Sequence, residues 1–306
     1  MAFTDTSAVA GLVTDAYDTE VENQNRLLPL LRILPDKHLV SPTHAGDTYT
    51  LFKYNDLPES SALLTETTDA TAVAVPDVDS VTVGIKEWGR VVQKTKKLDL
   101  VSLAQIDPII VDLLARDQAV SLDDEVAAIA YAGTNVVYGG SATSTVTLTA
   151  ADVLTADIGR DVVTSLRENA ASPRMGELYA AYVHPRVALD LRTETGAGGW
   201  RDDHVYAAPD LFWPGQTGTY EGAFYVESAR MKVATDGASS AKVYRSLFLG
   251  KQALAEVVWQ APGTVIGEVV DQLRRFRPFG WYAAMNWARY REENLFRVET
   301  GASTAN

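Results

Sequence analysis

The stretch from Arg274 to Tyr290, RRFRPFGWYAAMNWARY, holds the residue types best suited to binding a charged partner. Four arginines alternate with six aromatic residues, and no acid occurs from Gln272 to Arg291, although the chain carries a net charge of -13. Aromatic and cationic side chains together suit single-stranded nucleic acid, because bases stack on rings and phosphates pair with cations. The same residue types are enriched at protein interfaces, where arginine binds carboxylates through two hydrogen bonds. The stretch therefore predicts either a surface that binds single-stranded nucleic acid or a protein interface.

A second segment has the opposite charge pattern. Residues 55–79 contain six acids and no Lys or Arg. Segregation of opposite charges into two segments is typical of surfaces that meet between copies of a chain, so it favours the interface and a homo-oligomer. The predicted acidic contacts are Asp56, Glu59, Glu66 and Asp69. The predicted basic and aromatic-associated contacts are Lys94, Lys96, Lys97, Arg274, Arg275 and Arg277.

Residue patterns typical of catalysis or cofactor binding are weak in this chain. The chain has four histidines without metal-ligand spacing and no cysteine. Asp202 and Asp203 beside His204 could serve acid–base chemistry, but neighbouring charges on a loop more often form a solvated surface. No nucleophile elbow or phosphate-binding loop is present. We predict no catalytic, metal-binding or cofactor-binding residue, and we keep a soluble hydrolase using His184 or His204 as the least favoured alternative.

Length and composition indicate a protein that can fold without disulfide bonds or structural metal ions. With 306 residues and 46% hydrophobic content, the chain can bury a substantial core in one large domain or two intimate ones. No apolar stretch approaches the roughly 20 residues of a membrane span, so we expect no membrane contact. An acidic surface is repelled by nucleic acid, so we expect no sequence-specific DNA binding.

The elements that must position these segments can be read from periodicity and turn residues. Alternating patterns predict strands in DTYTLFKY and SVTVGIKEW on either side of the acidic segment, further strands within 219–249, and mostly extended structure over 264–299. Helical signals predict an arm over 15–34 that kinks or stops at Pro29. They also predict a rod of about 25 residues with Asp107 as its N-cap, Pro108 at its first position and Gly133 at its end, and a shorter helix opened by a Thr149–Asp152 capping box. His184 and Pro185 mark a turn from a strand into a helix.

The order of these parts resembles the major capsid protein of tailed bacteriophages, with its Hong Kong 97 type fold. The matching motifs are a His-Pro pair between strand and helix, spaced Gly and Ser near a strand, and a late Phe-Gly-Ala pattern, here His184 and Pro185; Gly218, Gly222 and Ser228; Phe248, Gly250 and Ala253. The resemblance covers nearly the whole chain. It implies an α+β fold with an N-terminal arm (1–45), an extended β-hairpin loop (46–98), a peripheral domain with a long spine helix (99–148 and 256–306) and an axial α/β domain (149–255).

This resemblance implies a structural protein. We expect pentamers and hexamers that assemble in the host cytoplasm into the icosahedral capsid of a virion, enclosing double-stranded DNA. The expected partners are further copies of the chain, a portal protein and, optionally, a decoration protein. Because no long coiled-coil segment precedes the arm, we also expect a separate scaffolding protein. An encapsulin-like nanocompartment shell shares the fold and stays open as an alternative.

Overall fold

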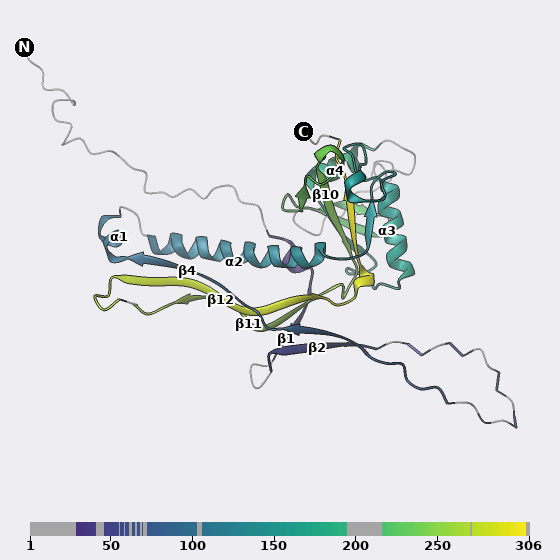
Figure 1. Cartoon of the computed structure of the whole chain (residues 1–306), viewed down its shortest axis with the longest axis horizontal. Coiled ribbons are helices and arrows are strands. Elements are labelled where there is room, and N and C mark those ends of the chain that lie inside the picture. The colour runs from purple at the N-terminus through teal and green to yellow at the C-terminus, as the bar shows by residue number, and fades with distance from the viewer. Residues whose placement is uncertain are drawn as a thin grey trace, which may run out of the picture.

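The computed structural model describes residues 29–40, 46–54, 72–102, 106–194, 216–269 and 271–303, and within the acidic segment residues 56, 57, 59, 60, 63, 64, 66, 67 and 69. The described chain forms an elongated part and a more compact part at one end of it (Figure 1). A four-stranded sheet with one long helix makes up the elongated part, and a seven-stranded sheet with two helices makes up the compact part. The mixed α+β prediction is confirmed.

The four-stranded sheet carries the long helix along its length. Its order is β1-β11-β12-β4, formed by Asp36–Leu39, Leu254–Ile266, Phe276–Arg289 and Glu87–Thr95. β1 runs parallel to β11, and the other neighbours are antiparallel. Helix α2, Ile106–Tyr131, buries Leu114, Leu122 and Val126 in the same core as Trp281 and Met285 of β12. The predicted extended structure after residue 264 is thus the final part of β11 together with β12 and a later strand.

The predicted rod is confirmed as α2, but its N-cap was wrong. Asp107 and Pro108 lie within the first turn, because Ile106 is already helical. The Asp107 carboxylate accepts a hydrogen bond from Lys94 of β4, so it pins the first turn to the sheet. Gly133 follows the helix, and its amide donates to the carbonyl of Ala130 at 3.2 Å, which closes the last turn as predicted.

The seven-stranded sheet has helices packed on one face. Its order is β5-β13-β10-β6-β8-β7, with β9 paired to β10, formed by Val136–Tyr138, Leu295–Thr300, Val243–Leu249, Tyr179–Val183, Ala223–Glu227, Gln216–Tyr220 and Val233–Ala234. Helices α3, Ala156–Glu168, and α4, Pro185–Thr193, share a core with Phe248 and Tyr225. Strand β5 precedes residue 149 and strand β13 follows residue 255. The seven-stranded sheet therefore includes strands from both sides of the predicted axial domain, 149–255.

The two helix starts in this part differ in how well the sequence predicted them. His184 caps α4, and its imidazole Nδ1 accepts a hydrogen bond from the Arg186 amide at 3.2 Å, as the strand-to-helix turn predicted. The Thr149–Asp152 capping box was wrong. Asp152 Oδ2 accepts from the Thr149 amide at 2.7 Å in a local turn, and α3 begins only at Ala156, where the side chain of Thr155 is the cap.

A separate hairpin projects beyond the four-stranded sheet. Strands β2, Thr48–Lys53, and β3, Asp79–Gly84, pair antiparallel, which confirms the two strands predicted around the acidic segment. Leu51 and Val83 pack on Ala255 and Val257 of β11. This small core fixes the direction in which the hairpin leaves the sheet (Figure 1).

The segment before β1 is anchored to its own chain. A 3-10 turn at Leu31–Ile33 is bound by the buried carboxylate of Asp123, whose Oδ1 accepts from the amides of Leu31 and Arg32 at 2.7 and 2.9 Å. Burial raises the pKa of Asp123, although these amides and Arg230 oppose the rise. Arg32 also reaches the buried carboxylate of Glu256 at 3.0 Å. Most of the predicted helical arm, residues 15–28, lies outside the described residues.

Candidate interaction surfaces

The acidic loop, residues 54–78, joins the two strands of the hairpin and extends well away from both sheets (Figure 1). Asp56, Glu59, Glu66 and Asp69 are all exposed there. Between these acids lie two leucines, and the side chains of Leu63 and Leu64 are 95% and 79% exposed. Leucines as exposed as these gain free energy if a partner covers them, so the loop presents apolar side chains among its acids.

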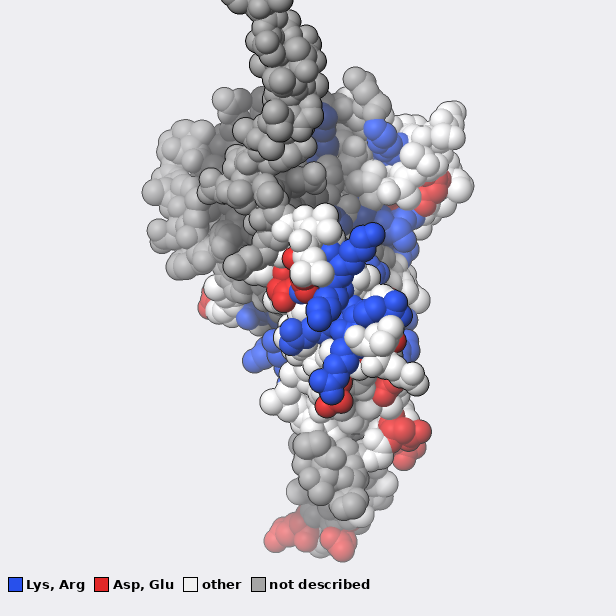
Figure 2. Space-filling view, turned by 90° about the vertical axis from the view of Figure 1, so that its left-hand side faces the viewer, with Lys and Arg blue, Asp and Glu red and all other residues white. Residues whose placement is uncertain are grey.

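The basic end is the opposite end of the elongated part, where helix α1, Lys96–Val101, lies beside the turn between β11 and β12 (Figure 1). Lys96, Lys97, Arg274, Arg275 and Arg277 are exposed there. Lys and Arg side chains gather on this end of the molecule (Figure 2). One copy of the chain therefore presents opposite charges at opposite ends, too far apart to meet each other.

Two of these arginines already have contacts within the chain. Arg275 donates from Nε to Asp271 at 2.5 Å, and this bond lowers the pKa of the Asp271 carboxyl. The guanidinium groups of Arg275 and Arg277 lie 5.2 and 5.3 Å from the ring centres of Phe276 and Phe279. These ring contacts hold the arginines in extended positions on the surface.

Lys94 differs from its predicted role. Its side chain is only 6% exposed and binds Asp99 of α1 at 2.7 Å and Asp107 of α2. Hydrogen bonds from these two carboxylates raise the pKa of Lys94. Because both acids belong to its own chain, Lys94 joins α1, α2 and β4 rather than facing a neighbour.

The basic end also carries apolar side chains that the sequence analysis did not identify. No residue of α1 is buried, and Leu98, Leu100 and Val101 are exposed on it together with the nearby Leu273. Several large apolar side chains exposed on one short segment suit an interaction site. Hydropathy alone could not reveal it, because KKLDLV also fits a helix that buries its leucines.

The junction between the two parts is held by charged side chains at the C-terminal end of α2. Arg289 donates to the carbonyl of Ile129 at 3.2 Å and to Glu292 at 2.5 Å. Glu292 also accepts from the amide of Thr134. Burial alone would raise the pKa of Glu292, but the hydrogen bonds from Thr134 and Arg289 outweigh it and hold this pKa below its ordinary value.

The predicted acid–base candidates do not form a reactive group in the described chain. The imidazole of His184 caps α4 and contacts the ring of Tyr244, with ring centres 4.9 Å apart and planes tilted by 51°. Burial and, to a smaller degree, the charge of Arg186 lower the pKa of His184. Asp202, Asp203 and His204 lie outside the described residues. Within the described ranges, no three His, Cys, Asp or Glu side chains gather as metal ligands would, and no helix has the length and apolar character needed to cross a membrane.

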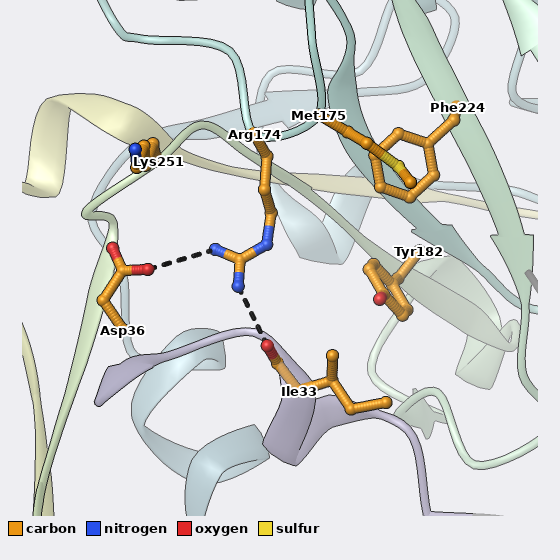
Figure 3. Close-up of a pocket in the computed structure, with 7 residues that line it drawn as sticks. All are labelled: Ile33, Asp36, Arg174, Met175, Tyr182, Phe224 and Lys251. Atoms are coloured by element: carbon orange, nitrogen blue, oxygen red, sulfur yellow. Dashed lines mark hydrogen bonds and ion pairs between the residues drawn. The ribbon is translucent and has the colours of Figure 1, made fainter.

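One pocket lies where the anchored N-terminal segment meets the seven-stranded sheet (Figure 3). Arg174 is its central cation, and it donates to the carbonyl of Ile33 at 2.9 Å and approaches Asp36 at 4.0 Å. Lys251 also lines the pocket, and its apolar wall comes from Met175, Tyr182 and Phe224. Because Arg174 is bound to residues 33–36, the pocket marks the place where the N-terminal segment packs on the sheet.

Comparison with known proteins identifies the family. A family model described as phage capsid protein matches residues 122–303, more than half of the chain. No curated protein matches it.

Solved capsids have the same fold at low identity. The capsid of cyanophage Pam1 is similar at a TM-score of 0.77 and 15% identity, covering 99% of this chain and 100% of that one. The capsid of Ralstonia phage GP4 gives 0.72 and 16%, covering 100% and 98%. The acid-stable capsid of Helicobacter pylori bacteriophage KHP30 gives 0.72 and 13%, covering 98% and 99%.

The family match favours a capsid over a nanocompartment shell or a hydrolase. The chain therefore belongs to the phage capsid protein family, as a major capsid protein with a structural role in the virion.

Proposed function

We propose that copies of this chain assemble as pentamers and hexamers into an icosahedral shell around double-stranded DNA, through a Hong Kong 97 type subunit. The proposal rests chiefly on the elongated part, which carries an acidic loop with exposed leucines at one end and a surface with exposed basic and apolar side chains at the other. A subunit with complementary surfaces at opposite ends can join to further copies in a closed array.

The subunit divides naturally along its two sheets. In this proposal α2 is the spine helix of the peripheral domain, with β1, β4, β11 and β12, and the hairpin β2–β3 is the base of the extended loop. The axial domain is the seven-stranded sheet with α3 and α4. Since β5 and β13 pair within that sheet, they extend the axial domain beyond 149–255 to residues 136–138 and 295–300.

Within the shell, the acidic loop of one subunit docks on the basic end of its neighbour. Asp56, Glu59, Glu66 and Asp69 supply the negative charge. The positive charge comes from Lys96, Lys97, Arg274, Arg275 and Arg277, which are exposed. Lys94 supports this surface from beneath because it holds α1 through Asp99. Opposed charges of this kind orient the two copies and speed their encounter.

Other partners follow from the same role. A separate scaffolding protein would direct assembly in the host cytoplasm, a portal protein would take one vertex, and a decoration protein would be optional. The net charge of -13 supports a container that holds DNA without gripping it, since phosphates are repelled by an acidic surface.

Neutralising the acidic loop tests the docking. The quadruple variant Asp56→Asn, Glu59→Gln, Glu66→Gln and Asp69→Asn should give far fewer particles by electron microscopy and sedimentation when expressed with its scaffold. Particle yield from the unchanged chain should also fall as salt rises, because screening weakens exposed charge pairs.

A matched variant separates local docking from overall charge. Neutralising four exposed acids on the compact part, Asp157, Asp161, Glu168 and Glu177, changes the net charge equally and should leave the particle yield near that of the unchanged chain. Equal yields from both quadruple variants at every salt concentration would remove the loop from the proposal.

A further inference from the structure

Residues 29–36, called the brace below, connect the elongated part to the compact part. On the elongated side, the Asp123 carboxylate of α2 binds two backbone amides of the brace. On the compact side, Arg174, which precedes β6, donates to the carbonyl of Ile33 at 2.9 Å. A segment bonded to both parts at once limits the angle between them.

The chain itself crosses between the two parts in three described segments, 132–135, 250–253 and 290–294. These segments bind one another. Nδ2 of Asn294 donates to the carbonyl of Lys251 at 2.7 Å, and Nδ2 of Asn135 donates to the carbonyl of Glu292 at 2.8 Å. Neither of the two described large sheets takes a strand from the other part. A small turn about the crossing segments therefore breaks no strand pairing.

The brace is loose where it meets the compact part. Arg174 approaches the Asp36 carboxylate at 4.0 Å, which exceeds the length of a hydrogen bond. A pocket of about 230 Å³ lies beside this pair, with an apolar wall formed by Met175, Tyr182 and Phe224 (Figure 3). Apolar surfaces gain free energy when they close on one another. Closure of the pocket would thus shorten the ion pair and bury apolar surface together.

The brace also leaves a buried ion pair incomplete on the elongated side. Arg32 reaches the fully buried Glu256 carboxylate with Nη2 alone, at 3.0 Å. Arg32 Nε and Glu256 Oε2 are buried too, and within the described chain neither forms a hydrogen bond. Arginine and carboxylate groups favour two parallel bonds, and a buried polar atom without a partner is destabilising. A small shift of the brace would supply the second bond.

We propose that the brace has two positions, the one described above and a tighter one. In the tighter position Arg174 closes on Asp36 and the pocket collapses. Arg32 then completes its forked pair with Glu256. Asp123 holds the brace in both positions, because its bonds to the two amides are already short, at 2.7 and 2.9 Å. The compact part thereby turns toward the elongated part about the three crossing segments.

Two positions of the brace give one chain two angles between its parts. The use of these angles rests on the proposed shell function, because pentamers and hexamers place identical chains in different surroundings. A neighbour shifts such an equilibrium only if it binds one position better than the other. The position of the brace should therefore differ between the subunits of the two rings.

Spin labels on either side of the pocket test the proposal, and the chain contains no cysteine that would compete for them. Lys37→Cys and Glu177→Cys place exposed labels beside Asp36 and Met175. Pulsed electron paramagnetic resonance on the full-length monomer should give two distances, the shorter one from the closed pocket. The matched control Glu168→Cys, Glu177→Cys holds both labels on the compact part and should give one distance. A single distance across the pocket, as narrow as that of the control, would overturn the proposal.

Asp36→Asn in the labelled chain tests what closes the pocket. The side-chain amide keeps an oxygen for the hydrogen bond from the Gln252 amide, at 2.7 Å in the unchanged chain, but loses the charge that attracts Arg174. The population at the shorter distance should fall about twofold or more, as expected for a partly exposed ion pair. Arg174→Gln keeps a donor for the Ile33 carbonyl and should act in the same direction, so it serves if the first variant does not fold. An unchanged population in a folded variant would contradict the proposal.

The same labels separate this proposal from the shell function. If the chain forms no particles with its scaffold but the monomer shows both distances, the shell function fails and the two positions of the brace stand. If particles form, and monomer and particles share one single distance, the shell function stands and the brace proposal fails.

Discussion

The seven-stranded sheet and the basic end differ in how far their apolar side chains are buried. In β6 every residue is buried, and in β10 all but one are. In α1 no residue is buried, and most of β4 is exposed. The chain completes the first region by itself, whereas the second is left with leucines and valines that only another molecule can cover.

This contrast separates two uses of hydrophobic residues in one chain. The sheet of the compact part is covered on both faces by its own chain, by α3 and α4 on one face and by α2 on the other. The elongated part leaves apolar and charged side chains exposed, where a partner could contact them. Substitutions in the two regions should therefore affect different properties, folding in one and assembly in the other.

The largest expected effect is on the stability of the compact part. Phe248 is fully buried and meets Tyr225 edge-on at 5.8 Å, so Phe248→Ala should lower the free energy of unfolding by about 4 kcal/mol. Urea unfolding of the monomer, followed by circular dichroism, measures this. A loss below about 1 kcal/mol would mean that this core contributes little to the stability of the compact part.

An intermediate effect is expected at the junction of the two parts. Glu292→Gln keeps the size of the side chain but weakens its bonds to Thr134 and Arg289, and should cost about 1 kcal/mol at pH 7. Since the pKa of Glu292 is lowered in the folded state, its stabilisation is complete above its ordinary pKa and is lost as pH falls through the folded one. The difference between variant and unchanged chain should thus shrink between pH 5 and pH 3, and a constant difference would contradict this.

The smallest effect on stability belongs to the basic end. Leu100 is 79% exposed, so Leu100→Ser should change the free energy of unfolding by less than about 0.5 kcal/mol. Particle yield should nevertheless fall, because the leucine is expected to be covered only in the assembly. If Leu100→Ser lowered the free energy of unfolding as much as Phe248→Ala, the basic end would contribute to folding in the same way as the seven-stranded sheet.

Periodicity predicted most of the elements, because each carries its own local signal. The alternation around Leu51 and Val83 predicted the hairpin, and the run from Asp107 to Gly133 predicted α2. The errors came at the helix starts. A cap depends on which backbone amides lack a partner. At the first site a tertiary contact decided this, because Lys94 took the Asp107 carboxylate, and at the second site Asp152 closed a local turn before α3 began.

The candidate surfaces were only partly visible in the sequence. Segregated charge pointed to the acidic loop and to the arginines, since charges are read directly from residue types. The burial of Lys94 and the exposure of Leu113 were hidden, because a lysine usually lies outside and a helical leucine usually lies inside. Both exceptions depend on how β4 and α2 pack together, which no local pattern specifies.

The anchored N-terminal segment has a consequence for the order of folding. Arg32 binds Glu256 at a separation of 224 residues, and β1 pairs with β11 at a similar distance along the chain. β5 likewise pairs with β13, which lies near the C-terminal end of the chain. Contacts this distant in sequence form slowly and require almost the whole chain to have left the ribosome. A nascent chain therefore cannot complete the four-stranded sheet before β12 is synthesised, or the seven-stranded sheet before β13 is synthesised.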